Sequence, residues 1–197
     1  MNTSPLAHTD SYKLSHKGFL DPLTEYIYSN LTARSSKYLP VPRDTYDDKV
    51  VVYWIQGFIK SYLIKEWNET FFFQPKDKVI ARFKRRCDTF LGPDALCMEH
   101  FAALHDLGYL PISIKALPEG SRVNLRVPFF TITNTDPRFA WLTNYLETII
   151  SCELWKPITT ATIAFEIRKM MNKFALETVG HAGGIEFLAH GFEFRGM

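Results

Sequence analysis

Cysteine is scarce in this sequence, and its placement gives no basis for a cross-link or a metal site. The 197 residues include three cysteines, Cys87, Cys97 and Cys152. Thiols so few and so widely spaced fit neither a disulfide framework nor the CxxC pairs of zinc sites. A basic flank followed by an apolar run, the mark of a signal peptide, is also missing near Met1. We therefore expect reduced thiols in a cytoplasmic protein.

Long apolar runs and a strong net charge are also absent. No segment reaches the ~18 apolar residues that a membrane-spanning helix needs, so no membrane partner is expected. Lys and Arg number 23 against 21 Asp and Glu, for a net charge of +2. That balance predicts no nucleic-acid partner. The basic run Arg82-Phe83-Lys84-Arg85-Arg86 is interpreted as a solvated helix face, with a phosphate or nucleic-acid patch as the alternative.

The common catalytic and phosphate-binding signatures are missing. There is no GxxxxGK[ST] phosphate loop, no GxGxxG and no HExxH. His100 and His105 lie five positions apart rather than the four that stack side chains on one helix face, so no metal role is predicted for them. His190 is a weak candidate for lining a site. Pattern rules alone identify no reaction.

The composition is that of a folded globular protein with many rings. Hydrophobic residues make up 46% of the chain, charged residues 22% and aromatic residues 15%. Such values predict a well-filled core, with some rings left over for stacking on a flat ligand.

Apolar periodicity and turn residues predict an α/β chain with several short strands and longer helices. Pro75, Gly92 and Gly108 mark helix ends, and Asp136-Pro137 is a helix start. The expected strands are 23–34, 112–116, 123–127, 129–134 and 185–196. The expected helices are 75–91, 97–107, 137–152 and 157–178. The segment 50–67 is expected to begin as a strand and continue as a helix. We divide the chain into an N-terminal α+β region, 1–150, and a second region, 151–197.

Met197 follows the last predicted strand directly, with no turn between them. An unpaired strand is a poor place to end a domain. We therefore expect either more chain or a partner chain to complete the fold.

Four residues near the two ends of the chain have the chemistry to hold a flat ring beside an anion. Tyr12 and Phe192 offer rings, and Arg34 and Arg195 offer the planar fork that matches phosphate. On a regular strand Phe192 and Arg195 point to opposite faces, so a bend or strand end must intervene for both to line one pocket. On pattern alone, packing or a surface charge is the commoner role for each.

Several segments together resemble the nicotinamide phosphoribosyltransferase family, in the family's order and at its spacing. The resemblance covers essentially the whole chain, and its specificity comes from the ordered set rather than from any one segment. The segments are Asp10-Ser11-Tyr12-Lys13, Pro111 to Gly120 (PISIKALPEG), Asn134-Thr135-Asp136-Pro137, Trp141-Leu142-Thr143-Asn144, Glu147-Thr148, Trp155 to Thr162 (WKPITTAT) and Phe192-Glu193-Phe194-Arg195-Gly196.

The resemblance implies a type II phosphoribosyltransferase, with an irregular α/β barrel and an additional, mostly β domain built from both ends of the chain. The barrel is incomplete in this chain. Such enzymes are homodimers with active sites at the subunit interface. They join nicotinamide to 5-phosphoribosyl 1-diphosphate, giving nicotinamide mononucleotide and diphosphate in NAD salvage. Mg²⁺ accompanies the diphosphate substrate, and ATP can act as an activator.

The resemblance also assigns roles to the four candidates. Phe192 looks like the ring on one face of nicotinamide, and Tyr12 like the ring on the other face, contributed by the second subunit. Arg195 looks like the arginine reaching the nicotinamide and phosphate region. Arg34 looks like a contact to the diphosphate across the subunit interface.

Family members run to more than twice this length, which limits what this chain is expected to do. The amide-binding carboxylate, the catalytic histidine and the main phosphate-binding residues are expected downstream of Met197. We therefore expect negligible activity from the chain alone. Two alternatives remain: the acid-specific nicotinate phosphoribosyltransferase, and a non-catalytic fragment that dimerises or binds, such as one half of a split enzyme.

Overall fold

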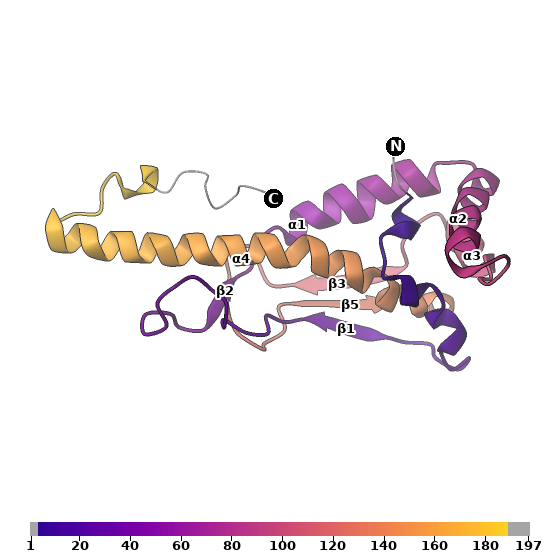
Figure 1. The fold of residues 1–197 in the computed structure, drawn as a ribbon, viewed down its shortest axis with the longest axis horizontal. Coiled ribbons are helices and arrows are strands. Elements are labelled where there is room, and N and C mark those ends of the chain that lie inside the picture. The colour runs from indigo at the N-terminus through magenta and orange to yellow at the C-terminus, as the bar shows by residue number, and fades with distance from the viewer. Residues whose placement is uncertain (1–3, 189–197) are drawn as a thin grey trace. The chain divides into compact units, whose positions relative to one another are not determined.

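The computed structural model describes residues 4–188 of the chain (Figure 1). The candidate residues Phe192 and Arg195, together with His190, lie outside that range. The chain divides into two compact units. Within the described range, unit 1 comprises 4–30, Gln56–Lys115 and Thr131–Ser151, and unit 2 comprises Leu31–Ile55, Ala116–Phe130 and 152–188.

Two helices of unit 1 end at the glycines that the sequence marks, whereas the first extends beyond its predicted end at residue 67. The first, α1 (Ile55–Phe58), continues as π-helical turns over Ile59–Glu66 and Asn68–Phe72. Next, α2 (Lys76–Leu91) follows Pro75 and ends at Gly92, whose φ is 103°. The third, α3 (Glu99–Leu107), ends at Gly108 with φ 82°, a left-handed conformation that glycine adopts without strain.

An aromatic core holds these helices together. Val79, Phe83 and Cys87 recur along the buried face of α2, at the spacing that places side chains on one side of a helix. Phe83 meets Phe101 of α3 edge to face, with ring centroids 5.1 Å apart. Phe101 in turn lies 5.3 Å from the ring of Trp141. Edge-to-face pairs of this kind add to the stabilisation that burial provides.

His100 is part of this core. It is buried, and its ring lies 4.9 Å from that of Trp141 at an interplanar angle of 89°. Burial lowers the pKa of His100 from 6.5 to about 4, because the charged form is costly away from water. The imidazole is therefore neutral at physiological pH.

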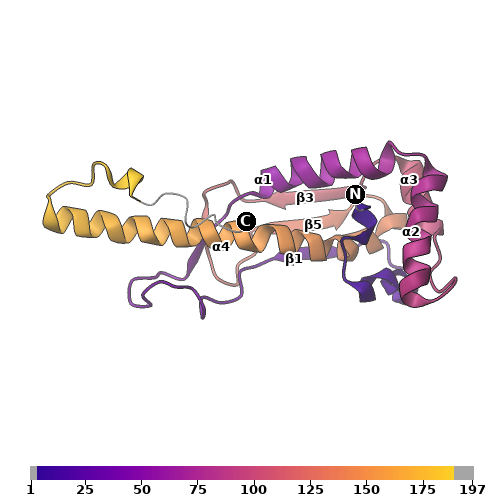
Figure 2. The same ribbon diagram turned by 45° about the horizontal axis from the view of Figure 1, so that its top comes forward.

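A three-stranded sheet has the order β1-β5-β3. It consists of β1 (Tyr28–Leu31), β5 (Phe130–Asn134) and β3 (Ile112–Ala116), which Figures 1 and 2 show side by side. The middle strand β5 alternates buried and half-buried residues, as expected when one face of a strand packs on a core. The predicted positions of these strands are confirmed, although β1 is much shorter than the predicted span 23–34.

The second sheet lies in unit 2. Its strands β2 (Lys49–Val51) and β4 (Arg122–Asn124) pair antiparallel, with Val50 opposite Val123. The predicted turn after β3 is present, since Ser121 N–H donates to the Pro118 carbonyl at 3.1 Å.

The longest helix, α4 (Trp141–Thr178), corrects the prediction of two helices separated at Pro157. Asp136 stands before it, and its carboxylate accepts from the Arg138 N–H at 3.0 Å as predicted for a helix start. Pro157 lies inside the helix. A proline in this position frees the carbonyl four residues earlier, which belongs to Glu153, an exposed residue. The helix continues through Pro157 without the expected interruption.

The described part of the predicted strand 185–196 is also different. Ile185–Phe187 forms a 3-10 helix after Gly184, whose φ is 87°. The Leu188 N–H donates to the Ile185 carbonyl at 3.1 Å, which curls the chain rather than extending it. The remainder of that prediction, and the division at residue 150, stay predictions. Among the described residues, no helix is long and apolar enough to cross a membrane.

Candidate functional site

Tyr12 is presented on the surface of unit 1 by a short 3-10 helix, Ser11–Leu14, called η2 below. The side chain is 59% exposed. Its hydroxyl donates to the Asp10 carboxylate at 3.1 Å, and its ring lies 5.2 Å from that of His16. The hydroxyl end of the ring is thus held in place, while most of the side chain is exposed to solvent.

Asp10 connects Tyr12 to the start of α4. Its carboxylate accepts from the Thr148 hydroxyl at 2.6 Å, and its N–H donates to the same oxygen at 3.2 Å. The Thr148 hydrogen bond holds the pKa of Asp10 below its usual value, and the bond to Asp10 raises the pKa of Tyr12. Both effects arise because hydrogen bonds stabilise the charged acceptor and the protonated donor. Tyr12 therefore stays a neutral phenol at physiological pH.

Lys13, the residue after Tyr12, forms further contacts between η2 and α4. Its side chain is only 6% exposed, and its ammonium lies 3.1 Å from Glu147 Oε2. It also donates to the Asn144 carbonyl at 3.0 Å, while Ser29 donates to the other Glu147 oxygen at 2.7 Å. A buried ammonium is stable only when paired and hydrogen-bonded in this way. These contacts fix the helix that presents Tyr12.

Arg34 lies in unit 2, in the loop between β1 and β2. Its side chain is exposed, and it forms no ion pair within residues 4–188. Its guanidinium is therefore open to an anion. Of the four candidates, the structure places Tyr12 and Arg34, each within its own unit, and Phe192 and Arg195 lie outside the described residues. The site roles of all four remain predictions.

No pattern in the sequence indicates that Lys13 and Glu147 form a pair. Both fall within segments that carry the family resemblance, but they are separated by 134 positions. Nothing in the local pattern of either residue distinguishes a buried, paired lysine from a solvated one.

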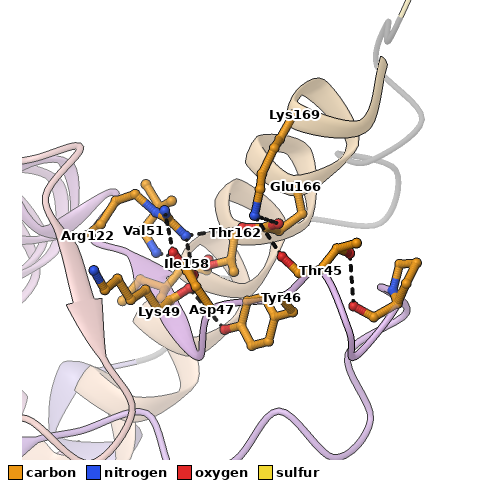
Figure 3. A network of polar contacts seen from close by, with 11 residues as sticks. Thr45, Tyr46, Asp47, Lys49, Val51, Arg122, Ile158, Thr162, Glu166 and Lys169 are labelled. Carbon is orange, nitrogen blue, oxygen red and sulfur yellow. Dashed lines mark hydrogen bonds and ion pairs between the residues drawn. The ribbon is translucent and has the colours of Figure 1, made fainter. Parts of the chain in front are cut away.

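A second polar cluster lies in unit 2 and links β4 and the loop before β2 to α4 (Figure 3). Glu166, 4% exposed, accepts from Arg122 at 3.1 Å and from Lys169 at 3.2 Å. Arg122 also meets Asp47 at 2.6 Å, and Lys169 donates to the Thr45 carbonyl at 2.8 Å. Each charge has a partner of opposite sign or a carbonyl, so the cluster holds structure together rather than offering a reactive group.

Two further bonds extend this cluster along α4. The Val51 N–H donates to the Thr162 hydroxyl at 2.9 Å, and that hydroxyl donates to the Ile158 carbonyl at 2.7 Å. Thr162 thereby satisfies a backbone donor of β2, as buried backbone groups require. Burial beside this cluster raises the pKa of Tyr46 to about 12.

The basic run on α2 separates into a buried and a solvated part. Phe83 is buried, and Lys84 pairs with Asp88 at 2.6 Å and with Asp94 at 2.7 Å. Arg82 and Arg85 are exposed, as predicted for a solvated helix face. Within residues 4–188, no group of three or more His, Cys, Asp or Glu side chains is placed to hold a metal ion.

Comparison with known proteins relates nearly the whole chain to one enzyme class. It is 50% identical over 194 residues to the nicotinamide phosphoribosyltransferase of Acinetobacter baylyi, covering 98% of this chain and 38% of that protein. It is 29% identical over 196 residues to the nicotinamide phosphoribosyltransferase of Mycoplasma genitalium, covering 95% of this chain and 43% of that protein. The chain is thus homologous to these proteins and spans about two fifths of their length. No protein-family model matches it.

The fold has a counterpart among solved structures. Human nicotinic acid phosphoribosyltransferase superposes with a TM-score of 0.57 at 17% identity, covering 83% of this chain and 28% of that one. Identity at this level shows the fold alone. The prediction of a mixed α/β chain that forms part of a larger phosphoribosyltransferase fold is confirmed to that extent.

Proposed function

We propose that this chain is the N-terminal part of a nicotinamide phosphoribosyltransferase. In the reaction, nicotinamide attacks 5-phosphoribosyl 1-diphosphate to give nicotinamide mononucleotide and diphosphate. The observation that carries the proposal is the 50% identity to the Acinetobacter baylyi enzyme over 98% of this chain. The open ring of Tyr12 and the unpaired guanidinium of Arg34 support it.

The reaction requires little acid–base catalysis. Displacement at the ribose carbon builds positive charge on the sugar and negative charge on the leaving diphosphate, which fixed cations stabilise. The pyridine nitrogen already carries a lone pair, so no general base is required. The ring has instead to be held in line for attack, and aromatic side chains on its two faces do this.

Tyr12 suits the positioning role. Its hydroxyl is fixed by Asp10 and its helix by Lys13, so little side-chain freedom is lost when a ring stacks on it. As in the family, we propose that Tyr12 covers the nicotinamide of the second subunit in a homodimer, opposite Phe192. Arg34 would contact diphosphate oxygens across the same interface, and Arg195 the nicotinamide and phosphate region.

Mg²⁺ and ATP remain proposals tied to the substrates. Mg²⁺ keeps several waters and binds through one or two carboxylates together with substrate phosphates. The described residues offer no acidic cluster for it. We therefore assign no step to residues 4–188 through the metal, and ATP as an activator likewise rests on the resemblance.

Formation of the mononucleotide by purified protein tests the proposal. We expect no detectable turnover from the 197 residues alone, and turnover with nicotinamide when a chain corresponding to the rest of the Acinetobacter baylyi relative is added. Turnover with nicotinate in place of nicotinamide would favour the acid-specific alternative. A stable complex that turns over neither substrate would favour a non-catalytic binding fragment.

A further inference from the structure

A pocket of about 210 Å³ opens in unit 1 between η2 and α2. Leu14 lines it from the N-terminal segment, and Phe83 and Phe90 line it from α2. Phe90 is 64% exposed, so one ring of the wall stands partly in solvent. The pocket is smaller than the ~300 Å³ at which sites for drug-sized ligands begin, and it therefore suits a ligand of about one ring.

One charged group faces this apolar space. Arg86 lines the pocket and has no hydrogen-bond or ion-pair partner within residues 4–188. Its neighbour in the basic run, Lys84, is already paired with Asp88. A guanidinium offers a planar fork of donors that matches a carboxylate in two parallel bonds.

The other polar groups in the wall, those of Thr9, Ser11 and Cys87, do not compete for Arg86. The Thr9 hydroxyl donates to the Tyr145 carbonyl at 2.9 Å. Burial raises the pKa of the Cys87 thiol, which keeps it neutral at physiological pH. The Ser11 hydroxyl adds a neutral donor and acceptor at the rim. The pocket therefore combines one unmatched positive charge with two phenyl rings.

We propose that this pocket binds a small aromatic monocarboxylate. The carboxylate pairs with Arg86, and the ring packs against Phe83 and Phe90. Inorganic phosphate fits less well. It has no apolar part to pack against the walls, and the single exposed guanidinium is the one charge that could bind it. This assignment does not rest on the proposed function.

The position of the pocket gives its ligand an effect on Tyr12. Ser11 and Leu14 belong to η2, the same short helix that carries Tyr12. A ligand wedged between η2 and α2 contacts both elements. Binding is therefore expected to alter the surroundings of the Tyr12 backbone as well as those of Cys87.

Titration of the full 197-residue chain with benzoate, followed by amide chemical shifts, tests the assignment. We expect saturable shifts at Ser11, Tyr12 and Cys87, with a dissociation constant of about 1 mM, as befits one charged contact and one ring. Benzamide, which is neutral, and acetate, which lacks the ring, should each bind about tenfold more weakly.

Substitutions distinguish binding in this pocket from a general attraction of anions to the basic surface of α2. Arg86→Gln should weaken benzoate about tenfold, and Phe90→Ala should also weaken it. Arg85→Gln removes an exposed neighbouring charge that does not line the pocket and should change the affinity less than about twofold. Arg86 and Phe90 are both exposed, so the substitutions should leave the fold intact. Preserved dispersion of the amide signals shows that each variant is folded.

Three outcomes would overturn the assignment. The first is equal binding of benzoate and benzamide, and the second is an equal loss in the Arg85 and Arg86 variants. The third is the absence of saturable shifts at the pocket, including the case in which phosphate alone perturbs α2. None of these measurements involves turnover, so their failure is distinct from failure of the phosphoribosyltransferase proposal.

Discussion

The ammonium of Lys13 lies 3.1 Å from the carboxylate of Glu147, which joins the N-terminal segment to the first turns of α4 across 134 positions of sequence. Lys13 is nearly inaccessible to solvent, whereas Glu147 is 39% exposed. The pair fixes the residue that follows Tyr12. The position of Tyr12 therefore depends on tertiary contacts within unit 1, and not on the neighbouring sequence alone.

Replacing Lys13 by Met tests this relationship. The variant leaves Glu147 without its cation and the Asn144 carbonyl without its donor, and we expect unit 1 to lose about 2–3 kcal/mol of stability. Urea denaturation followed by Trp fluorescence measures the loss. Lys17→Met, at an exposed position nearby, should change the free energy of unfolding by less than about 0.5 kcal/mol. Equal effects at the two positions would show that the pair is not structural.

The cluster in unit 2 allows a comparison between a buried and an exposed carboxylate. Glu166→Gln removes the charge that Arg122 and Lys169 share, but Asp47 and the Thr45 carbonyl remain as partners. We expect a destabilisation of about 2 kcal/mol, less than for a fully buried pair because both cations keep some contact with water.

Glu186→Gln is the matched control for that experiment. Glu186 pairs with Arg168 at 3.4 Å and is half exposed, so its loss should cost less than about 0.5 kcal/mol. Both variants are read by chemical denaturation at low and at high salt. A Glu166 effect that disappears in salt, as a surface pair would, contradicts the buried arrangement of Figure 3.

The parts of the fold that the sequence predicted are those with local causes. Gly92 and Gly108 end α2 and α3 because only glycine readily adopts their positive φ angles, and both can be read from the sequence. Pro157 misled the prediction, because whether a proline ends a helix depends on where the freed carbonyl points. Here the freed carbonyl belongs to Glu153, an exposed residue, and α4 continues past Pro157.

The candidate site was predictable to a smaller degree. Tyr12 is a candidate because of its ring, and the family resemblance assigns it a role in stacking, which stays a prediction. The groups that hold it, Asp10 with Thr148 and Lys13 with Glu147, come from segments more than 130 positions apart. No periodicity or spacing rule connects such segments, because their proximity follows from the packing of unit 1.

His100 should make unit 1 sensitive to mild acid. Its folded pKa is lowered from 6.5 to about 4, so between these values the unfolded chain binds more protons than the folded one. The contribution of His100 to the free energy of unfolding is therefore complete above the pKa of the unfolded chain. It is lost as the pH falls toward the pKa of the folded protein. We expect about 2 kcal/mol of stability to be lost between about pH 7.5 and about pH 5.

Urea titrations of the wild type and of His100→Gln across that range measure this contribution. The variant is less stable at every pH for reasons of packing, so the comparison rests on the slope with pH and not on the absolute free energy of unfolding. The slope should be shallower in the variant, since the other titrating groups contribute alike to both proteins. Parallel curves would mean that His100 is solvated rather than buried against Trp141.

Tyr12 offers the sharpest test of how this chain takes part in the proposed reaction. Tyr12→Phe keeps the ring and loses only the exposed hydrogen bond to Asp10, so KM for nicotinamide should change by less than about threefold. Tyr12→Ala removes the stacking surface, and we expect KM to rise by about tenfold or more while the fold is retained.

Both variants are assayed in the complex with a C-terminal partner chain, and the KM for 5-phosphoribosyl 1-diphosphate is measured alongside. A loss confined to nicotinamide supports stacking, whereas an equal rise in both KM values indicates a general disturbance of the interface. If Tyr12→Ala binds nicotinamide as well as the wild type does, Tyr12 does not cover the ring. The exposed Tyr12 side chain would then serve a different contact.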